Sequence, residues 1–119
     1  MLAQIIKHKG QEMVFSDLRL KSSEEMIDIL KDASEKLSSY EKRGISTLYL
    51  LDLTGVPMTE EFSQEAMRIA KKHVPFIRKS AIIGVTGIKR MFFEVYLLFT
   101  KSKMRSFQTK DAAMEYLVS

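Results

Sequence analysis

Residues 45–58 read Ile-Ser-Thr-Leu-Tyr-Leu-Leu-Asp-Leu-Thr-Gly-Val-Pro-Met and decide the fold class of this 119-residue chain. The apolar run over residues 48–51 ends in Asp52, the chain breaks at Thr54-Gly55, and a helical pattern follows. A short apolar run without alternation is typical of a strand buried on both faces of a helix-covered sheet. Open α/β folds place their binding sites at the carboxyl ends of such strands, so the residues after this run are the first candidates for a functional site.

Upstream of this strand, the pattern predicts a hairpin and then a helix. Residues 3–9 and 12–20 are the two strands of the hairpin, with Gly10 in the turn. Residues 22–25, Ser-Ser-Glu-Glu, form a capping-box pattern that opens the helix, and Gly44 ends it. The apolar stripe of this helix consists of Met26, Leu30, Ala33, Leu37 and Tyr40.

Downstream, strands and helices continue to alternate. Residues 59–76 predict a second helix, residues 80–86 a second buried strand, and Gly87 a turn into a third helix. Residues 104–107 predict an edge strand, and residues 110–118 a closing helix capped by Thr109. The predicted inward-facing residues are Phe62, Ala66, Ile69, Ala70 and His73 in the second helix and Ala112, Ala113, Tyr116 and Leu117 in the last. In the third helix, one face is shared by Ile88, Phe92, Val95, Tyr96 and Phe99.

The order β-β-α-β-α-β-α-β-α predicts an α/β fold in a single domain over residues 1–119. We expect a mixed, mostly parallel sheet of four to five strands, with an N-terminal hairpin and about four helices.

Composition excludes several classes of function. The chain lacks cysteine, so it has no disulfide framework and no thiolate metal site. Its two histidines lack carboxylates at metal-ligand spacing, and we expect no metal and no cofactor. The net charge of +4 permits attraction to anions, but no nucleic-acid motif is present. The start of the chain does not resemble a secretory signal and no apolar run is long enough for a transmembrane segment, so we expect a cytoplasmic protein.

Two strings and their order resemble the STAS superfamily, closest to small bacterial SpoIIAA-like, or STAS/SEC14-like, proteins. The strings are Leu-Asp-Leu-Thr-Gly-Val at residues 51–56 and Ala-Ile-Ile-Gly-Val-Thr-Gly-Ile-Lys-Arg at residues 81–90. A Phe-Gln-Thr at residues 107–109 and an Ala-Met-Glu-Tyr-Leu at residues 113–117 complete the pattern, which covers the chain from about Gly10. The resemblance implies a non-enzymatic module that acts in signalling through protein–protein interaction.

The anti-sigma-antagonist branch of that family is phosphorylated on a Ser or Thr at the start of the helix after the Asp-containing strand. The matching pair in this sequence is Glu60 and Glu61, so the acceptor hydroxyl is missing. Thr59 and Ser63 lie nearby but outside the motif. A carboxylate at this place imitates part of a phosphate's charge, or simply stabilises the helix dipole.

Candidate site residues cluster after the two buried strands. Asp52 is predicted to accept hydrogen bonds from amides of the following turn, and no local partner indicates acid–base catalysis. The segment from Thr86 through Gly87 to Lys89 and Arg90 has the features of an anion site, because amides at a helix start and two cations would face the same ligand. The alternative is that both cations reach surface acids such as Glu60, Glu61 or Glu94. The full candidate set is Asp52, Thr54, Gly55, Thr59, Glu61, Thr86, Gly87, Lys89 and Arg90.

The third helix is apolar almost all the way round, so one face packs on the sheet and the remainder needs another cover. A neighbouring helix, a second copy in a homodimer and an acyl chain all remain open. Basic residues around the last two helices could form a rim for anionic lipid headgroups; they are Arg78, Lys79, Lys101, Lys103 and Arg105.

Two functions follow. The first is a non-enzymatic STAS-like regulatory module that presents residues 54–61 to a protein partner. The second is a small-anion or lipid-binding carrier that uses the third helix and its start at residues 87–90. Both require that the corners at Thr54 and Gly87 lie together at one edge of the sheet.

Overall fold

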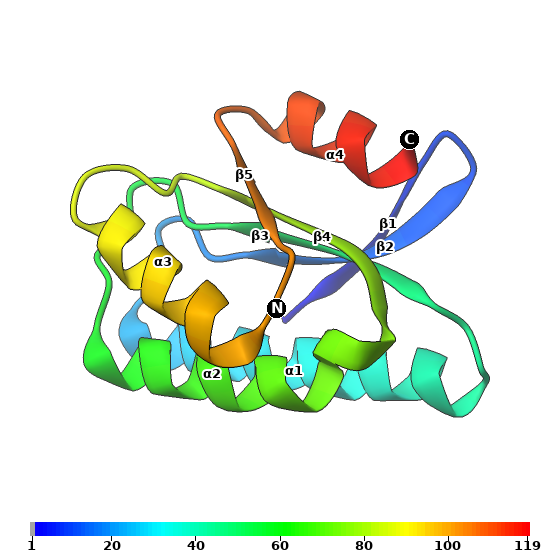
Figure 1. The fold of residues 1–119 in the computed structure, drawn as a ribbon, viewed down its shortest axis with the longest axis horizontal. Coiled ribbons are helices and arrows are strands. Elements are labelled where there is room, and N and C mark those ends of the chain that lie inside the picture. The colour runs from blue at the N-terminus through cyan, green and yellow to red at the C-terminus, as the bar shows by residue number, and fades with distance from the viewer. Residues whose placement is uncertain (1) are drawn as a thin grey trace.

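The computed structural model describes residues 2–119 as a five-stranded sheet with helices on both faces (Figure 1). The strands lie in the sheet in chain order; β1 is antiparallel to β2 and the other neighbours are parallel. The predicted element order and sheet type are confirmed. The elements are β1 (Gln4–His8), β2 (Gln11–Asp17), α1 (Ser23–Lys42), β3 (Thr47–Asp52), α2 (Glu60–His73), the 3₁₀ turn η1 (Val74–Phe76), β4 (Ile77–Ile83), α3 (Lys89–Thr100), β5 (Arg105–Phe107) and α4 (Lys110–Val118).

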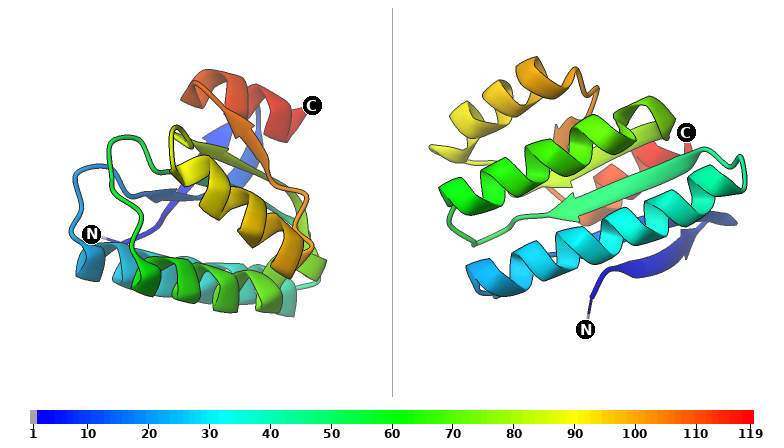
Figure 2. Two further views of the ribbon diagram at one scale, coloured as in Figure 1. Left: turned by 60° about the vertical axis from the view of Figure 1, so that its left-hand side comes forward. Right: turned by 90° about the horizontal axis from the view of Figure 1, so that it is seen from below.

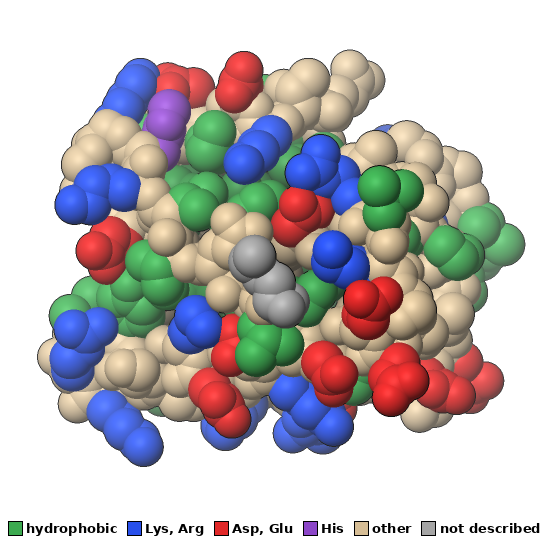
Figure 3. Space-filling model, turned by 180° about the vertical axis from the view of Figure 1, so that it is seen from behind, with side chains coloured by type: hydrophobic (Ala, Val, Ile, Leu, Met, Phe, Trp, Pro, Cys, Tyr) green, Lys and Arg blue, Asp and Glu red, His purple; other side chains and the backbone are tan. Residues whose placement is uncertain are grey.

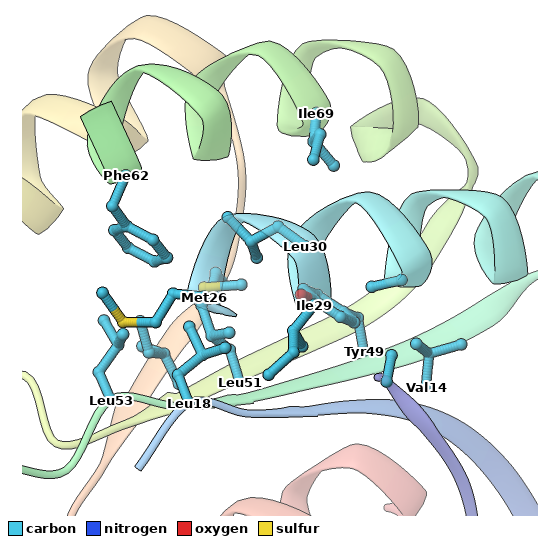
Figure 4. Packing of buried hydrophobic residues seen from close by; sticks show 14 of the residues in the cluster. Val14, Leu18, Met26, Ile29, Leu30, Tyr49, Leu51, Leu53, Phe62 and Ile69 are labelled. Atoms are coloured by element: carbon cyan, nitrogen blue, oxygen red, sulfur yellow. The ribbon is translucent and has the colours of Figure 1, made fainter. Parts of the chain in front are cut away.

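The sheet separates two apolar clusters. Helices α1 and α2 lie side by side under one face with α3 beyond α2, whereas α4 covers the other face (Figure 2). In the larger cluster, Met26 and Leu30 of α1 and Phe62 of α2 meet side chains of β2 and β3 (Figure 4). Every residue of β3 is buried, as its apolar run predicts for a strand covered on both faces.

Three of the four predicted helix starts, those of α1, α2 and α4, are confirmed by capping hydrogen bonds. At α1, the Ser22 hydroxyl accepts from the Glu25 amide while the Glu25 carboxylate accepts from the Ser22 amide, which is a complete capping box. Thr59 caps α2 and Thr109 caps α4 in the same way, each accepting the amide three residues on. These caps fix where the loops end and the helices begin.

Two strand boundaries differ from the prediction. The strand predicted over residues 12–20 ends at Asp17, because the chain turns there and Leu20 has a φ of 59° and is exposed. The strand predicted over residues 80–86 runs instead from Ile77 to Ile83. Its first residues emerge at the surface and tolerate charge, and the positive φ of Gly84 ends it.

The apolar face predicted for α3 is mostly exposed. Phe93, Tyr96 and Leu97 pack against the large cluster, so Tyr96 is the one member of the predicted group that faces inward. Ile88, Phe92, Val95 and Phe99 are exposed. Periodicity could not choose between the faces because both are apolar.

The last helix needs a smaller correction. Ala113 and Leu117 are fully buried against the sheet, and Tyr116 is partly buried, as predicted. Ala112 faces solvent instead. Among the described residues, no helix is both long and apolar enough to cross a bilayer.

Candidate functional site

The corners after β3 and β4 lie together at one edge of the sheet, as the prediction required. The Leu53 amide donates to the Ile83 carbonyl at 2.8 Å, which extends the β3–β4 pairing past Asp52. Gly84 then passes directly against the next corner: a Cβ at Gly84 would lie 2.4 Å from the Thr54 nitrogen. Only glycine permits this approach, and its φ of 87° is also one that other residues rarely adopt.

Asp52 holds the β3–α2 turn, as predicted. Its carboxylate is almost fully buried, and Oδ1 accepts from the Thr54 amide at 2.9 Å and the Thr54 hydroxyl at 2.6 Å. These bonds give the side chain the structural role of an Asx turn.

A second carboxylate and its arginine stand beside Asp52, and sequence reasoning missed both. Asp17 is the register partner of Asp52 on β2, and Arg19 donates to Asp17 at 2.8 and 2.9 Å. The Arg19 Nε also lies 3.6 Å from Oδ2 of Asp52. The hydrogen bonds from Arg19 lower the pKa of Asp17 and, reciprocally, raise that of Arg19. The signal available in the sequence was an acid at the end of both β2 and β3.

Lys89 crosses from the start of α3 to the β3–α2 turn. Its ammonium donates to the carbonyl oxygens of Leu53 at 2.9 Å and Val56 at 3.1 Å. Burial lowers the pKa of Lys89, and the nearby charge of Asp52 opposes that shift. Lys89 therefore reaches backbone carbonyls, not the surface acids or the external anion that the sequence left as alternatives.

Several donors predicted for an anion site at the start of α3 are used within the chain. The backbone amides of Lys89, Arg90 and Met91 each donate to the carbonyl oxygen three residues earlier in the chain, so these three amides already have partners. The N-cap position is Ile88, whose side chain makes no capping bond. With these amides and the Lys89 ammonium committed internally, an anion would find mainly the exposed Arg90 at this corner.

The remaining predicted residues lie at the surface of the same edge. Thr54, Gly55, Thr86 and Gly87 are exposed in the two turns, and Glu61 is exposed in the first turn of α2. Thr59 is half-buried, and its hydroxyl accepts from the Phe62 amide and lies 3.3 Å from the Ser23 hydroxyl. In residues 2–119, no three Asp, Glu or His side chains gather as a metal site would require.

A cavity lies at the other end of α3. It has a volume of about 460 Å³ and opens between α2, β4 and the segment that joins α3 to β5. Its walls are largely apolar, with Leu51, Ile69 and Met104 among them. Tyr96 also lines it, and burial raises the pKa of this phenol to about 12, so the side chain is a neutral hydrogen-bonding group at ordinary pH.

Cations surround the same cavity. Arg78, Lys79, Lys101 and Lys103 all contribute to its lining, so most of the predicted basic rim converges there. Lys79 donates to the carbonyl oxygens of Tyr116 and Ser119, whereas Lys101 and Lys103 are exposed beyond the end of α3.

His73 joins α1 to α2 in a hydrogen-bonded line with Ser34 and Glu41. Its Nδ1 lies 2.6 Å from the Glu41 carboxylate and its Nε2 lies 2.7 Å from the Ser34 hydroxyl. The ring is fully buried. The order of groups is that of a hydrolytic triad, but Ser34 lies inside α1, where backbone amides are committed to the helix and cannot stabilise an oxyanion. We interpret the line as a structural link, and the burial of His73 agrees with its predicted place on the inner face of the second helix.

Comparison with solved structures supports the same architecture. A protein of Shewanella loihica PV-4, described as an uncharacterised member of the DUF3478 family with a SpoIIAA-like fold, is similar over 97% of this chain and 91% of its own. The TM-score is 0.66 and the sequence identity 19%. This chain has the SpoIIAA-like fold, which is the STAS fold. Comparison of the sequence with family models and curated proteins gives no match. At this identity the likeness shows the fold alone.

Proposed function

We propose that this SpoIIAA-like protein is a non-enzymatic binding module whose cavity between α2, β4 and the α3–β5 segment holds a small amphiphilic anion. The observation that carries the proposal is the combination of apolar walls and cationic rim in one cavity of about 460 Å³. Ligand pockets in proteins span about 300–1,000 Å³, and most are apolar with a few polar groups that fix orientation. The proposal keeps the predicted carrier function and moves its site from the start of α3 to its end.

The walls and the rim favour different parts of one ligand. An alkyl or aryl group gains about 25 cal/mol per Å² of apolar surface removed from water. Lys101 and Lys103 are exposed at the mouth, where a carboxylate or phosphate can be bound while it stays partly hydrated. A fully buried anion would carry a large desolvation cost, which this placement avoids.

Titration calorimetry with dodecanoate, dodecyl phosphate, dodecanol and inorganic phosphate tests the proposal. We expect the two amphiphilic anions to bind, dodecanol to bind at least tenfold more weakly, and phosphate alone not to bind. The substitution Ala70→Leu should abolish binding, because Ala70 lines the cavity and the added methyl groups occupy it.

A matched pair of charge variants tests the rim. Lys101→Asn with Lys103→Gln should weaken dodecanoate binding at least fivefold, and Asn suits the left-handed conformation at position 101. Lys71→Gln with Lys72→Gln removes the same charge from exposed positions of α2 outside the cavity and should leave binding unchanged. Equal effects of the two pairs, or tight binding of dodecanol, would contradict the proposal.

A second candidate is the predicted regulatory module that presents residues 54–61 to a protein partner. It is favoured by a turn that is both exposed and rigidly held: Thr54 and Gly55 face solvent while Asp52 and Lys89 fix the backbone beneath them. A photoreactive residue at position 54 should crosslink in cells to one protein, and Lys89→Met should reduce that adduct. Absence of any adduct would count against this candidate.

A further inference from the structure

The exposed side of α3 carries an uninterrupted row of large apolar side chains. The row, called the α3 stripe below, consists of Ile88, Met91, Phe92, Val95, Leu98 and Phe99. Their spacing of three and four residues places them on one side of a helix. Leu98 is 77% exposed and Phe99 61%, so the stripe is open to solvent and is not the edge of the core.

The stripe belongs to a larger apolar surface. Met91, Phe92 and Val95 line a groove of about 310 Å³ between α3 and α2, to which Met67 of α2 also contributes. Contiguous apolar patches of a few hundred Å² on soluble proteins mark binding surfaces. Helix α3 lies at the front in Figure 1, and Figure 3 shows the opposite face of the molecule. On that opposite face, acidic and basic side chains are interspersed.

Charge decides between the occupants that could cover the stripe. Arg90 is exposed in the first turn of α3, and Lys101 and Lys103 are exposed just beyond its last turn. Glu94 is the one acid within the helix. A stripe of about 18 Å is therefore flanked by cations at both ends.

This charge pattern disfavours a second copy. The interface of a symmetric dimer brings the same patch of both subunits together. With antiparallel α3 helices, Arg90 would approach Lys101 and Lys103 of the other subunit. With parallel helices, each of these cations would approach the same residue of the other subunit. Like charges juxtaposed across an interface oppose association.

We propose that the α3 stripe docks the protein onto the surface of an anionic lipid bilayer. Apolar side chains of an amphipathic helix insert at the boundary of headgroups and acyl chains, while flanking Lys and Arg contact lipid phosphates. The helix is already folded and fixed against α2, so docking requires no ordering of the chain. The inference depends on the outer surface of α3 and shares Lys101 and Lys103 with the rim of the cavity, but it does not require a ligand in the cavity.

Flotation of the purified 119-residue chain with vesicles tests the proposal. We expect binding to vesicles of equal phosphatidylcholine and phosphatidylglycerol, at least tenfold weaker binding to phosphatidylcholine alone, and release as the salt concentration rises. Leu98→Gln with Phe99→Gln should reduce the partition coefficient at least tenfold. Both positions are exposed, so the fold should be retained.

Leu20→Gln is the matched control, since Leu20 is 95% exposed in the loop before α1 and lies outside the stripe. It should change partitioning less than twofold. Arg90→Gln with Lys103→Gln should weaken binding to anionic vesicles more than Lys71→Gln with Lys72→Gln. The cavity variant Ala70→Leu should bind vesicles like the wild type, which separates this inference from the proposed ligand site.

Three results would overturn the inference. The wild type could fail to float with anionic vesicles, or the stripe variant could bind as well as the Leu20 variant. The third is a concentration-dependent dimer in sedimentation that Leu98→Gln with Phe99→Gln dissolves, which would assign the stripe to a second copy.

Discussion

Replacement of Gly84 by alanine should destabilise the protein by about 4 kcal/mol. The new Cβ would lie 2.4 Å from the Thr54 nitrogen and 2.8 Å from the Leu53 carbonyl carbon, so one of the two corners must move. An alanine at the φ of 87° costs about 1–2 kcal/mol. Loss of the hydrogen bond from the Leu53 amide to Ile83 adds about 1 kcal/mol, and weakening of the Lys89 bond to Leu53 adds about 1.5.

Gly55→Ala is the control for this experiment. Gly55 also has a positive φ, 75°, but a Cβ there meets nothing within 4 Å, so only the backbone cost of about 1–2 kcal/mol is expected. Urea unfolding followed by far-ultraviolet circular dichroism gives both free energies of unfolding. The difference between the two variants isolates the close approach of the corners. If both lose the same stability, the packing of Gly84 against Thr54 does not limit the fold and the reasoning is wrong.

Three further predictions concern polar side chains. Arg19 lowers the pKa of Asp17 in the folded protein. The stabilisation from the ionised carboxylate is therefore present above the unfolded-state pKa of about 3.9 and is lost as the pH falls through the lower folded-state pKa. The difference in unfolding free energy between the wild type and Asp17→Asn should shrink in acid titrations. Lys89→Met should lower the free energy of unfolding by about 2 kcal/mol and speed amide hydrogen exchange at Val56, because two backbone carbonyls lose a charged donor. Unchanged exchange at Val56 would contradict the role given to Lys89. His73→Ala should lower the free energy of unfolding in urea by about 3 kcal/mol, because it leaves a cavity and removes two hydrogen bonds. The control His8→Ala should cost less than about 1 kcal/mol, because the pair of His8 with Glu115 is exposed. Equal losses would refute the structural link between α1 and α2.

The candidate site was predictable in part because some of its interactions are local in sequence. Asp52 bonds the residue two positions on, and Thr59 the amide three positions on, so both roles follow from short spacing. Arg19 reaches Asp52, and Lys89 reaches Leu53 and Val56, each more than 30 positions away in the chain. Their partners depend on which strands are neighbours and in what register, which no single segment encodes.

The cavity illustrates the same limit. Its cations were recognised in the sequence as a basic group, but their convergence depends on how β4 starts and how the segment after α3 returns to the sheet. Because β4 starts three residues earlier than predicted, Arg78 and Lys79 lie within the strand and not before it.

The sequence by itself determined the order of the elements, the helix caps and the burial of β3, because periodicity and capping are properties of segments a few residues long. The tertiary structure decided which side of α3 is covered. Both sides of that helix are apolar, so its sequence favours neither, and only its packing against α2 and the sheet buries Phe93 and Leu97 and leaves Leu98 and Phe99 in solvent. The energy of burial depends on area removed from water by neighbours, and neighbours are set by the fold.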